Sequence, residues 1–508
     1  MSSKIKKLHI PLNRAEGDLE IKVDVTDGTI TDAWSCGTMY RGFEAMMTGR
    51  GPLDGLVIAP RICGICSLTH LNAAAAALDR IAQVTLPDNA IRLRNVALMA
   101  ETIQSDLRQA VLMYMADFTN HKAYHRHALF KEAVARYQML SGSSVVEGIR
   151  KTKRLIEIIA IIGGQWPHTS FMVPGGVTSI PYVPKLMQCR LIFDRFLDWY
   201  EKKVLGCTVK RWQAVTTRKE LAQWLEERPE HRDSEVGFFV RFAQKAGLDT
   251  CGRGDDHFLC FGNFPLPKDT AVTPRVPGTD RLTTPGFATG TECRPLDAAN
   301  IKEDITCSWF EQKPAARHPY DSVTRPYASG NMGKPYSWVK APRYDGLAAE
   351  TGPLAEAVMD RVPLFQDLIS KNGATALVRQ LARITRPARL LPDMGTWIDE
   401  LLAHHAEPFY TPIKTIPDGQ GAGMIQAARG ALGHWVTIEN SKISGYQIIT
   451  PTAWNGSPRD GQMQPGPWET ALKGTPVKDP DNPVEAGHVI RSFDPCMVCA
   501  VHIVKNEK

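Results

Sequence analysis

The chain has 508 residues, a mass of 56.3 kDa and 43% hydrophobic residues, enough to bury a large core. A formal charge of only +6 and the lack of a long Lys/Arg run disfavour nucleic-acid binding. No signal peptide opens the sequence, no apolar run reaches the roughly 20 residues of a membrane span, and 11 cysteines indicate reduced thiols.

Residues 1–60 form a predicted N-terminal β segment. Ile21, Val23 and Val25 alternate with charged residues, and Asp27-Gly28 supplies a hairpin turn. Glu16 and Glu44 each stand close to a glycine at a predicted strand edge, where backbone can approach closely. On their own, these two places are also compatible with simple surface turns.

Residues 61–205 contain a first cysteine pair followed by a helical core. The apolar spacing predicts helices over 70–81, 90–115, 128–140 and 145–162. Long helices in succession are typical of a bundle. Asp106 falls among apolar residues of the second helix, where a buried carboxylate needs a partner.

The remaining chain continues this α+β, predominantly α pattern. Residues 206–350 are predicted as peripheral loops and helices, and residues 351–410 as core helices. Residues 411–508 form a C-terminal segment with short strands at 433–438 and 446–449 and a second cysteine pair. We expect one unit of 508 residues, with a long-helix bundle as its core and small peripheral β elements.

The two cysteine pairs, Cys63/Cys66 and Cys496/Cys499, both have C-x-x-C spacing, which can place two thiolates on one metal. A structural zinc site is one interpretation, although zinc ribbons usually space their pairs by roughly 15–20 residues. A dithiol redox motif and a thiolate site for a softer transition metal are the others. A site that used both pairs would tie the two ends of the fold together.

Taken in order, the motifs resemble the large subunit of nickel–iron hydrogenases, from Arg14 to His502. Its two signatures appear as Arg61-Ile-Cys-Gly-Ile-Cys66 with His70, and as Asp494-Pro-Cys-Met-Val-Cys-Ala-Val-His502. Other phrases of the family stand between them, such as Tyr336-Ser-Trp-Val-Lys-Ala-Pro-Arg-Tyr344, Arg429-Gly-Ala-Leu-Gly-His434 and Pro451-Thr-Ala-Trp-Asn455. Ala15-Glu-Gly-Asp18 and Gly164-Gln-Trp-Pro-His168 are most similar to the cytoplasmic uptake and sensory branch.

This resemblance implies a nickel–iron centre with carbon monoxide and cyanide on the iron. Cys63 and Cys496 would be terminal nickel ligands, and Cys66 and Cys499 would bridge the two metals. Arg429, Thr452 and His70 match positions around this cofactor, and Asp106 and Asp494 match acidic partners of the arginine. An arginine in a dry pocket also polarises whatever binds beneath it.

The resemblance also implies the acid–base path and a second metal site. The Cys496 sulfur would accept the proton released from H2, and Glu16 would carry it outward. Glu44 and His502 match ligands of a divalent ion, usually Mg²⁺, near the C-terminus. Ala428 departs from the family, which commonly has proline before the arginine.

The implied activity is that of an uptake hydrogenase, which splits H2 into protons and electrons. The electrons would pass to an iron–sulfur small subunit. A regulatory H2 sensor that signals to a kinase is the alternative. The family further implies maturation proteins, a C-terminal protease acting after His502, heterodimers that can assemble further, and a cytoplasmic location with membrane association only through a partner.

Overall fold

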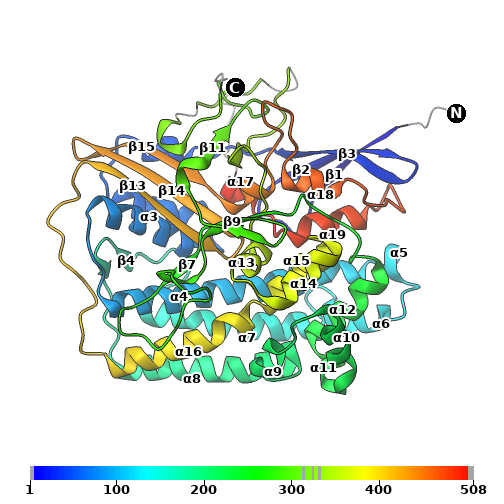
Figure 1. Cartoon of the computed structure of the whole chain (residues 1–508), viewed down its shortest axis with the longest axis horizontal. Coiled ribbons are helices and arrows are strands. Elements are labelled where there is room, and N and C mark those ends of the chain that lie inside the picture. Colours follow the sequence, from blue (N-terminus) through cyan, green and yellow to red (C-terminus); the bar gives the residue numbers. More distant parts are fainter. Residues whose placement is uncertain (1–4, 312–314, 323–324, 330–332, 501–508) are drawn as a thin grey trace.

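Four long helices lie side by side in the computed structural model, which describes residues 5–311, 315–322, 325–329 and 333–500 (Figure 1). They are α4 (Asp88–Arg108), α7 (Ser143–Gly163), α8 (Val183–Trp199) and α16 (Pro387–Ala403). Apolar side chains from these helices, including Ile103, Leu155 and Leu391, are fully buried and supply the hydrophobic free energy that holds the bundle together. The predicted fold class, α+β and mainly α, is confirmed.

An antiparallel sheet covers helix α3 (Ser67–Ile81) at one end of this bundle (Figure 1). Its strands are β13 (Gly419–Ala427), β14 (Gly430–Glu439) and β15 (Lys442–Ile449). The sheet approaches the helix so closely that a Cβ atom on Gly423 would lie 1.8 Å from the Ala73 carbonyl oxygen. The turn between β13 and β14, Ala428-Arg429, is thereby held over the start of α3.

An N-terminal sheet, formed by β1 (Lys6–Pro11), β2 (Leu19–Thr26) and β3 (Thr29–Gly37), packs against segments from late in the chain (Figure 1). The predicted hairpin turn at Asp27-Gly28 joins β2 to β3. Beside this sheet lie the C-terminal helices α18 (Pro467–Leu472) and α19 (Val484–Ser492). Ile30 donates its backbone N–H to the Thr475 carbonyl at 3.0 Å.

Several elements differ from the predicted ones. The predicted helix over 90–115 changes at Gln109 into a π-helical turn (Gln109–Tyr114) and then a 3₁₀ turn (Met115–Thr119). The Gln109 amide donates to the Arg491 carbonyl at 2.7 Å, which ties this irregular turn to α19. Helix α12 (Glu235–Ala246) lies in the region predicted as peripheral, yet it contributes three fully buried phenylalanines to the core.

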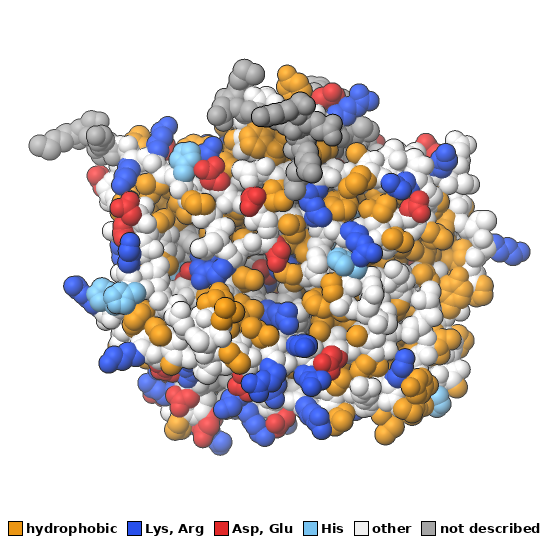
Figure 2. Space-filling model, turned by 180° about the vertical axis from the view of Figure 1, so that it is seen from behind, with side chains coloured by type: hydrophobic (Ala, Val, Ile, Leu, Met, Phe, Trp, Pro, Cys, Tyr) orange, Lys and Arg blue, Asp and Glu red, His pale blue; other side chains and the backbone are white. Residues whose placement is uncertain are grey.

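The surface mixes charges of both signs. On the face shown in Figure 2, Lys and Arg side chains are interspersed with Asp and Glu and with apolar residues. Within the described ranges, no helix combines the length and apolar character required to cross a membrane.

Candidate metal centre

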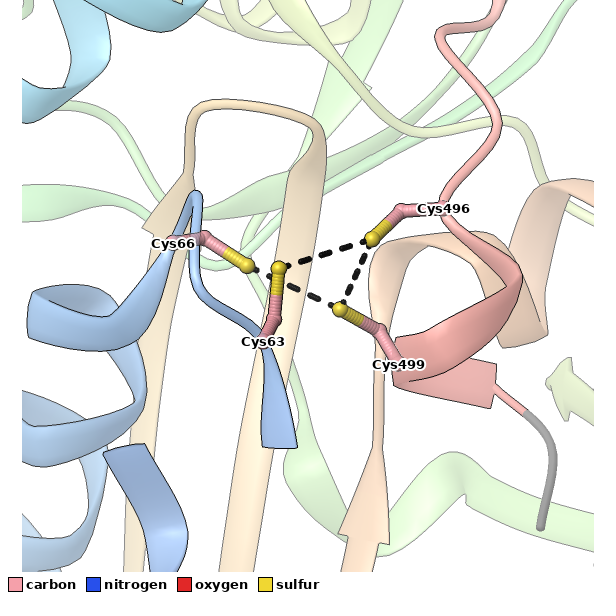
Figure 3. A group of neighbouring side chains, drawn as sticks. All are labelled: Cys63, Cys66, Cys496 and Cys499. Atoms are coloured by element: carbon pink, nitrogen blue, oxygen red, sulfur yellow. Dashed lines mark hydrogen bonds between the residues drawn. The ribbon is translucent and has the colours of Figure 1, made fainter. Parts of the chain in front are cut away.

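The four predicted cysteines converge on one point in the interior (Figure 3). Cys63 and Cys66 come from the loop before α3, Cys499 lies in the short helix α20 (Met497–Ala500), and Cys496 directly precedes this helix. The Sγ–Sγ distances are 3.7 Å for Cys63–Cys496, 3.6 Å for Cys66–Cys499 and 3.0 Å for Cys496–Cys499. All four sulfurs lie within 4.8 Å of one another, as ligands of a shared metal group must.

Backbone contacts from the N-terminal segment fix the second cysteine pair. The Glu16 carbonyl accepts the N–H of Met497 at 2.6 Å and that of Val498 at 3.2 Å. Gly17 has φ +84°, and a Cβ atom there would lie 3.0 Å from the Val498 nitrogen, so glycine is required. Arg41 Nη1 donates to the Ile62 and Val498 carbonyls, at 2.5 and 3.1 Å, and so links both cysteine motifs.

The pKa values of the clustered thiols are shifted in opposite directions. The pKa of Cys63 lies well below its usual value because the neighbouring thiols, Cys496 first, donate hydrogen bonds to its sulfur. Interactions with Cys496 in turn raise the pKa of Cys66 and of Cys499. Four ionised thiolates in this buried space would repel one another strongly, so the cluster is suited to multivalent metal cations, which bind the thiolate form.

Arg429 and Thr452 lie close to the cysteines. Arg429 Nε lies 3.2 Å from Asp494 Oδ1, and the Thr452 hydroxyl accepts the Cys496 N–H at 3.0 Å. Arg429 Nη1 is buried and has no hydrogen-bond partner among the residues the structure describes. A buried donor of this kind is costly unless something else accepts its proton.

Glu16 faces a cavity of about 300 Å³ whose lining also includes Arg429, Asp494 and Gln104. Its side chain is half-buried, and the pKa of Glu16 is raised first by this burial and then by the negative charge of Cys63. A carboxyl with a raised pKa next to the thiol cluster is suited to accepting and releasing a proton.

Asp106 is connected to Asp494 through an arginine rather than by direct contact. Its carboxylate binds Arg386, and Arg383 Nη1 lies 3.5 Å from Asp106 Oδ1 and 3.3 Å from Asp494 Oδ2. Burial raises the pKa of Asp106 to about 6, although Arg386 opposes this shift. The sequence interpretation missed both arginines. Their signal is a set of arginines at helical spacing in an apolar run: Arg379, Arg383, Arg386 and Arg389.

His70 lies in a buried polar chain rather than alone. Its Nδ1 is 3.0 Å from His434 Nε2, and His434 Nδ1 is 2.8 Å from the Tyr446 hydroxyl. Burial lowers the pKa of His70 to about 4, so the ring is neutral at pH 7.

The predicted second metal site is only partly within the described residues. Glu44 Oε1 accepts from Lys340 Nζ at 2.9 Å and from the Ile448 N–H at 3.0 Å. Lys340 also donates to Glu303 and Gln447, and these neighbours of Glu44 were not identified from the sequence. His502 lies outside the described residues.

Comparisons with known proteins agree with this geometry. The sequence matches the family described as nickel-dependent hydrogenase over residues 41–120 and 236–502. The chain is 30% identical to the periplasmic [NiFeSe] hydrogenase large subunit of Desulfomicrobium baculatum, over 99% of this chain and 96% of that protein. The Ni-Fe-Se hydrogenase of D. vulgaris Hildenborough is structurally similar, with a TM-score of 0.81 and 29% identity over 98% of this chain and 100% of its own.

A more distant relative is the uptake hydrogenase large subunit of Bradyrhizobium diazoefficiens, at 25% identity over 97% of this chain and 94% of that protein. The predicted cytoplasmic location is corrected by these comparisons, because the relative from D. baculatum is named a periplasmic enzyme. The predicted place in the cytoplasmic uptake and sensory branch likewise finds no support.

Proposed function

Because the chain belongs to the nickel-dependent hydrogenase family and is a hydrogenase large subunit, we propose that it catalyses H2 uptake at a nickel–iron centre held by Cys63, Cys66, Cys496 and Cys499. The observation that carries this proposal is the convergence of four buried sulfurs from the two ends of the chain. The likeness to a relative named an uptake hydrogenase supports the direction of turnover.

The side chains present fit such a centre. Soft thiolates suit nickel and iron, and Arg429 Nη1 offers a buried donor without a partner in the described part of the chain. A cyanide bound to iron would accept a hydrogen bond from such a group. The pairs Cys63–Cys496 and Cys66–Cys499, with Sγ–Sγ distances of 3.7 and 3.6 Å, would together hold the nickel and the iron.

When bound, the centre supplies the heterolytic cleavage of H2. The protein then has to remove the proton. We propose that Cys496 Sγ accepts this proton first. Glu16, which lines the adjoining cavity, then carries the proton outward. Arg429 and Asp494 would orient and electrostatically stabilise the reacting group, with Thr452 holding the Cys496 backbone and His70 at the edge of the site.

A Mg²⁺ ion near Glu44 and His502 is a further part of this proposal. Carboxylate oxygens suit a hard cation, and Glu44, Glu303 and Gln447 bring three side-chain oxygens around Lys340. The ammonium group of Lys340 would balance part of their charge.

Hydrogenase large subunits pair with a small subunit, and we propose an iron–sulfur protein as this partner. The single cysteine cluster within the described residues is the four-thiol site itself, so electrons need a relay outside them. Maturation proteins that insert the metals, and a protease acting after His502, complete the proposed set of partners.

Metal analysis and infrared spectroscopy test the centre directly. We expect nickel and iron in equal amounts in the isolated protein, together with carbon monoxide and cyanide stretching bands. Stoichiometric zinc without these bands would overturn the proposal.

A further inference from the structure

Arg386 lies at the junction of α15 (Ala376–Thr385) and α16 and is 1% exposed. It donates to both carboxylate oxygens of Asp106, at 2.8 and 2.7 Å, and to Glu356 at 3.2 Å. Its Nη2 also donates to the carbonyl oxygen of Ala428 at 2.6 Å. Every branch of this guanidinium therefore has an assigned acceptor.

The Ala428 contact is the one that reaches the metal centre. Ala428 directly precedes Arg429 in the turn between β13 and β14. Its carbonyl lies 3.4 Å from Arg383 Nη1 as well, and Arg383 in turn contacts Asp494, the ion partner of Arg429. The backbone before Arg429 and the carboxylate beside it are thus both tied to arginines of one helical segment.

Arg386 is also the middle of a buried chain of alternating charges. Successive members lie within ion-pair distance of one another, and the chain runs through Arg429, Asp494, Arg383, Asp106, Arg386, Glu356, Arg389 and Asp360. Four positive groups alternate with four negative ones, so each buried charge has an opposite neighbour. A change at one member deprives each neighbour of one of its opposite charges in a region of low dielectric.

We propose that Arg386 is a positioning residue: by clamping Ala428 and Asp106 it fixes the turn that presents Arg429 to the four cysteines. Arg386 itself touches none of the cysteines in the described contacts. This inference rests on the proposed metal centre, because Arg429 matters through what it faces there.

Arg386→Lys tests the clamp while it keeps the charge. One ammonium group cannot hold both oxygens of Asp106 and the Ala428 carbonyl in the planar fork that Arg386 forms. We expect wild-type nickel and iron content, shifted or split cyanide bands, and kcat lowered roughly 10²-fold with KM unchanged, the typical cost of a misplacement of about 1 Å.

Arg92→Lys is the matched control. Arg92 is fully buried and donates to Glu400 at 2.9 Å and to the Asp269 carbonyl at 2.8 Å. It lies on α4, fourteen positions and therefore about 21 Å along the helix from Asp106. This variant should keep wild-type bands. The inference would be overturned if Arg386→Lys showed the cyanide bands of the wild-type protein, or if both variants showed the same shift of these bands.

A double variant covers the case in which Arg386→Lys does not fold. Arg386→Gln with Asp106→Asn removes both charges of the pair, so neither is left buried alone. Shifted cyanide bands in this protein support the clamp, and unshifted bands overturn it. Wild-type protein without any such bands would overturn the metal centre itself, which separates that failure from failure of the clamp.

Discussion

Glu16 acts on the site through two different groups. Its backbone carbonyl accepts the N–H groups that begin α20, while its side chain faces the cavity beside Arg429. A substitution of the side chain therefore leaves the backbone support of Cys499 in place. This separation makes Glu16 a suitable position at which to test proton transfer alone.

Glu16→Gln keeps the size of the side chain but removes its ability to carry a proton. We expect nickel and iron to remain bound while exchange of H2 with solvent deuterium falls roughly 10²–10⁴-fold, the usual contribution of a positioned acid–base group. Metal analysis and mass-spectrometric gas exchange measure the two outcomes.

Asp18→Asn provides the comparison, because Asp18 is an exposed carboxylate two residues further on. It should exchange at the wild-type rate, and Cys496→Ser should lose nickel. Loss of metal from Glu16→Gln would show that Glu16 has a structural role instead.

Among the elements, helix α3 depends on a carboxylate from another helix. Glu101 of α4 is fully buried and accepts from the N–H groups of Leu68 and Thr69, both at 3.0 Å, and from Trp166 Nε1 at 3.2 Å. The first turn of α3, which follows Cys66 directly, thus receives its cap from α4. Burial nevertheless raises the pKa of Glu101 from 4.5 to about 7, despite these donors.

Glu101→Gln should change how stability depends on pH. Because the folded pKa is raised, the contribution of Glu101 is fully present below pH 4.5 and is lost as pH rises through about 7, by on the order of 3 kcal/mol. The melting temperature of the wild-type protein should therefore fall relative to that of the variant between pH 5 and 8. Parallel melting curves across this range would contradict the assignment.

The elements that the sequence did not reveal have physical explanations. Strand β13 contains Gly419, Gly421 and Gly423, a pattern typical of a loop. Those glycines instead permit contact with α3, where a Cβ on Gly421 would lie 2.3 Å from the Ala77 carbonyl. The apolar periodicity predicts α4 and α7 because their apolar faces repeat within one segment, whereas the close packing of β13 on α3 joins residues far apart in the sequence.

At the scale of the whole molecule, the metal site also combines features visible within one segment with features that arise only when distant segments pack together. Each C-x-x-C pair is visible locally, and the resemblance supplied the expected roles of the cysteines, Glu16 and Arg429. Arg383, which bridges Asp106 to Asp494, and Arg386, which binds Asp106, were missed, since their relation exists only once α4, α15 and the C-terminal segment pack together. The cytoplasmic location was wrong because short phrases of sequence do not determine a compartment.

The final residues give a prediction about maturation. A Lys-Asn-Glu-Lys end is costly to bury, and His502 is proposed to bind an ion inside the protein, so we expect cleavage after His502 in the active enzyme. Intact-mass analysis of nickel-loaded, H2-oxidising protein should show a chain without residues 503–508. A mass that still includes Lys508 in fully active material would refute cleavage.

The separation of the two cysteine pairs has a consequence for biosynthesis. Cys63 leaves the ribosome 433 residues before Cys496, which corresponds to roughly 20–90 s at ordinary rates of translation. Throughout that interval two reactive thiols have no partner pair, and oxidation or a stray metal could capture them. Assembly of the complete thiolate set must therefore wait until Cys496 and Cys499 have been synthesised, which favours a chaperone that protects the early pair until metal insertion.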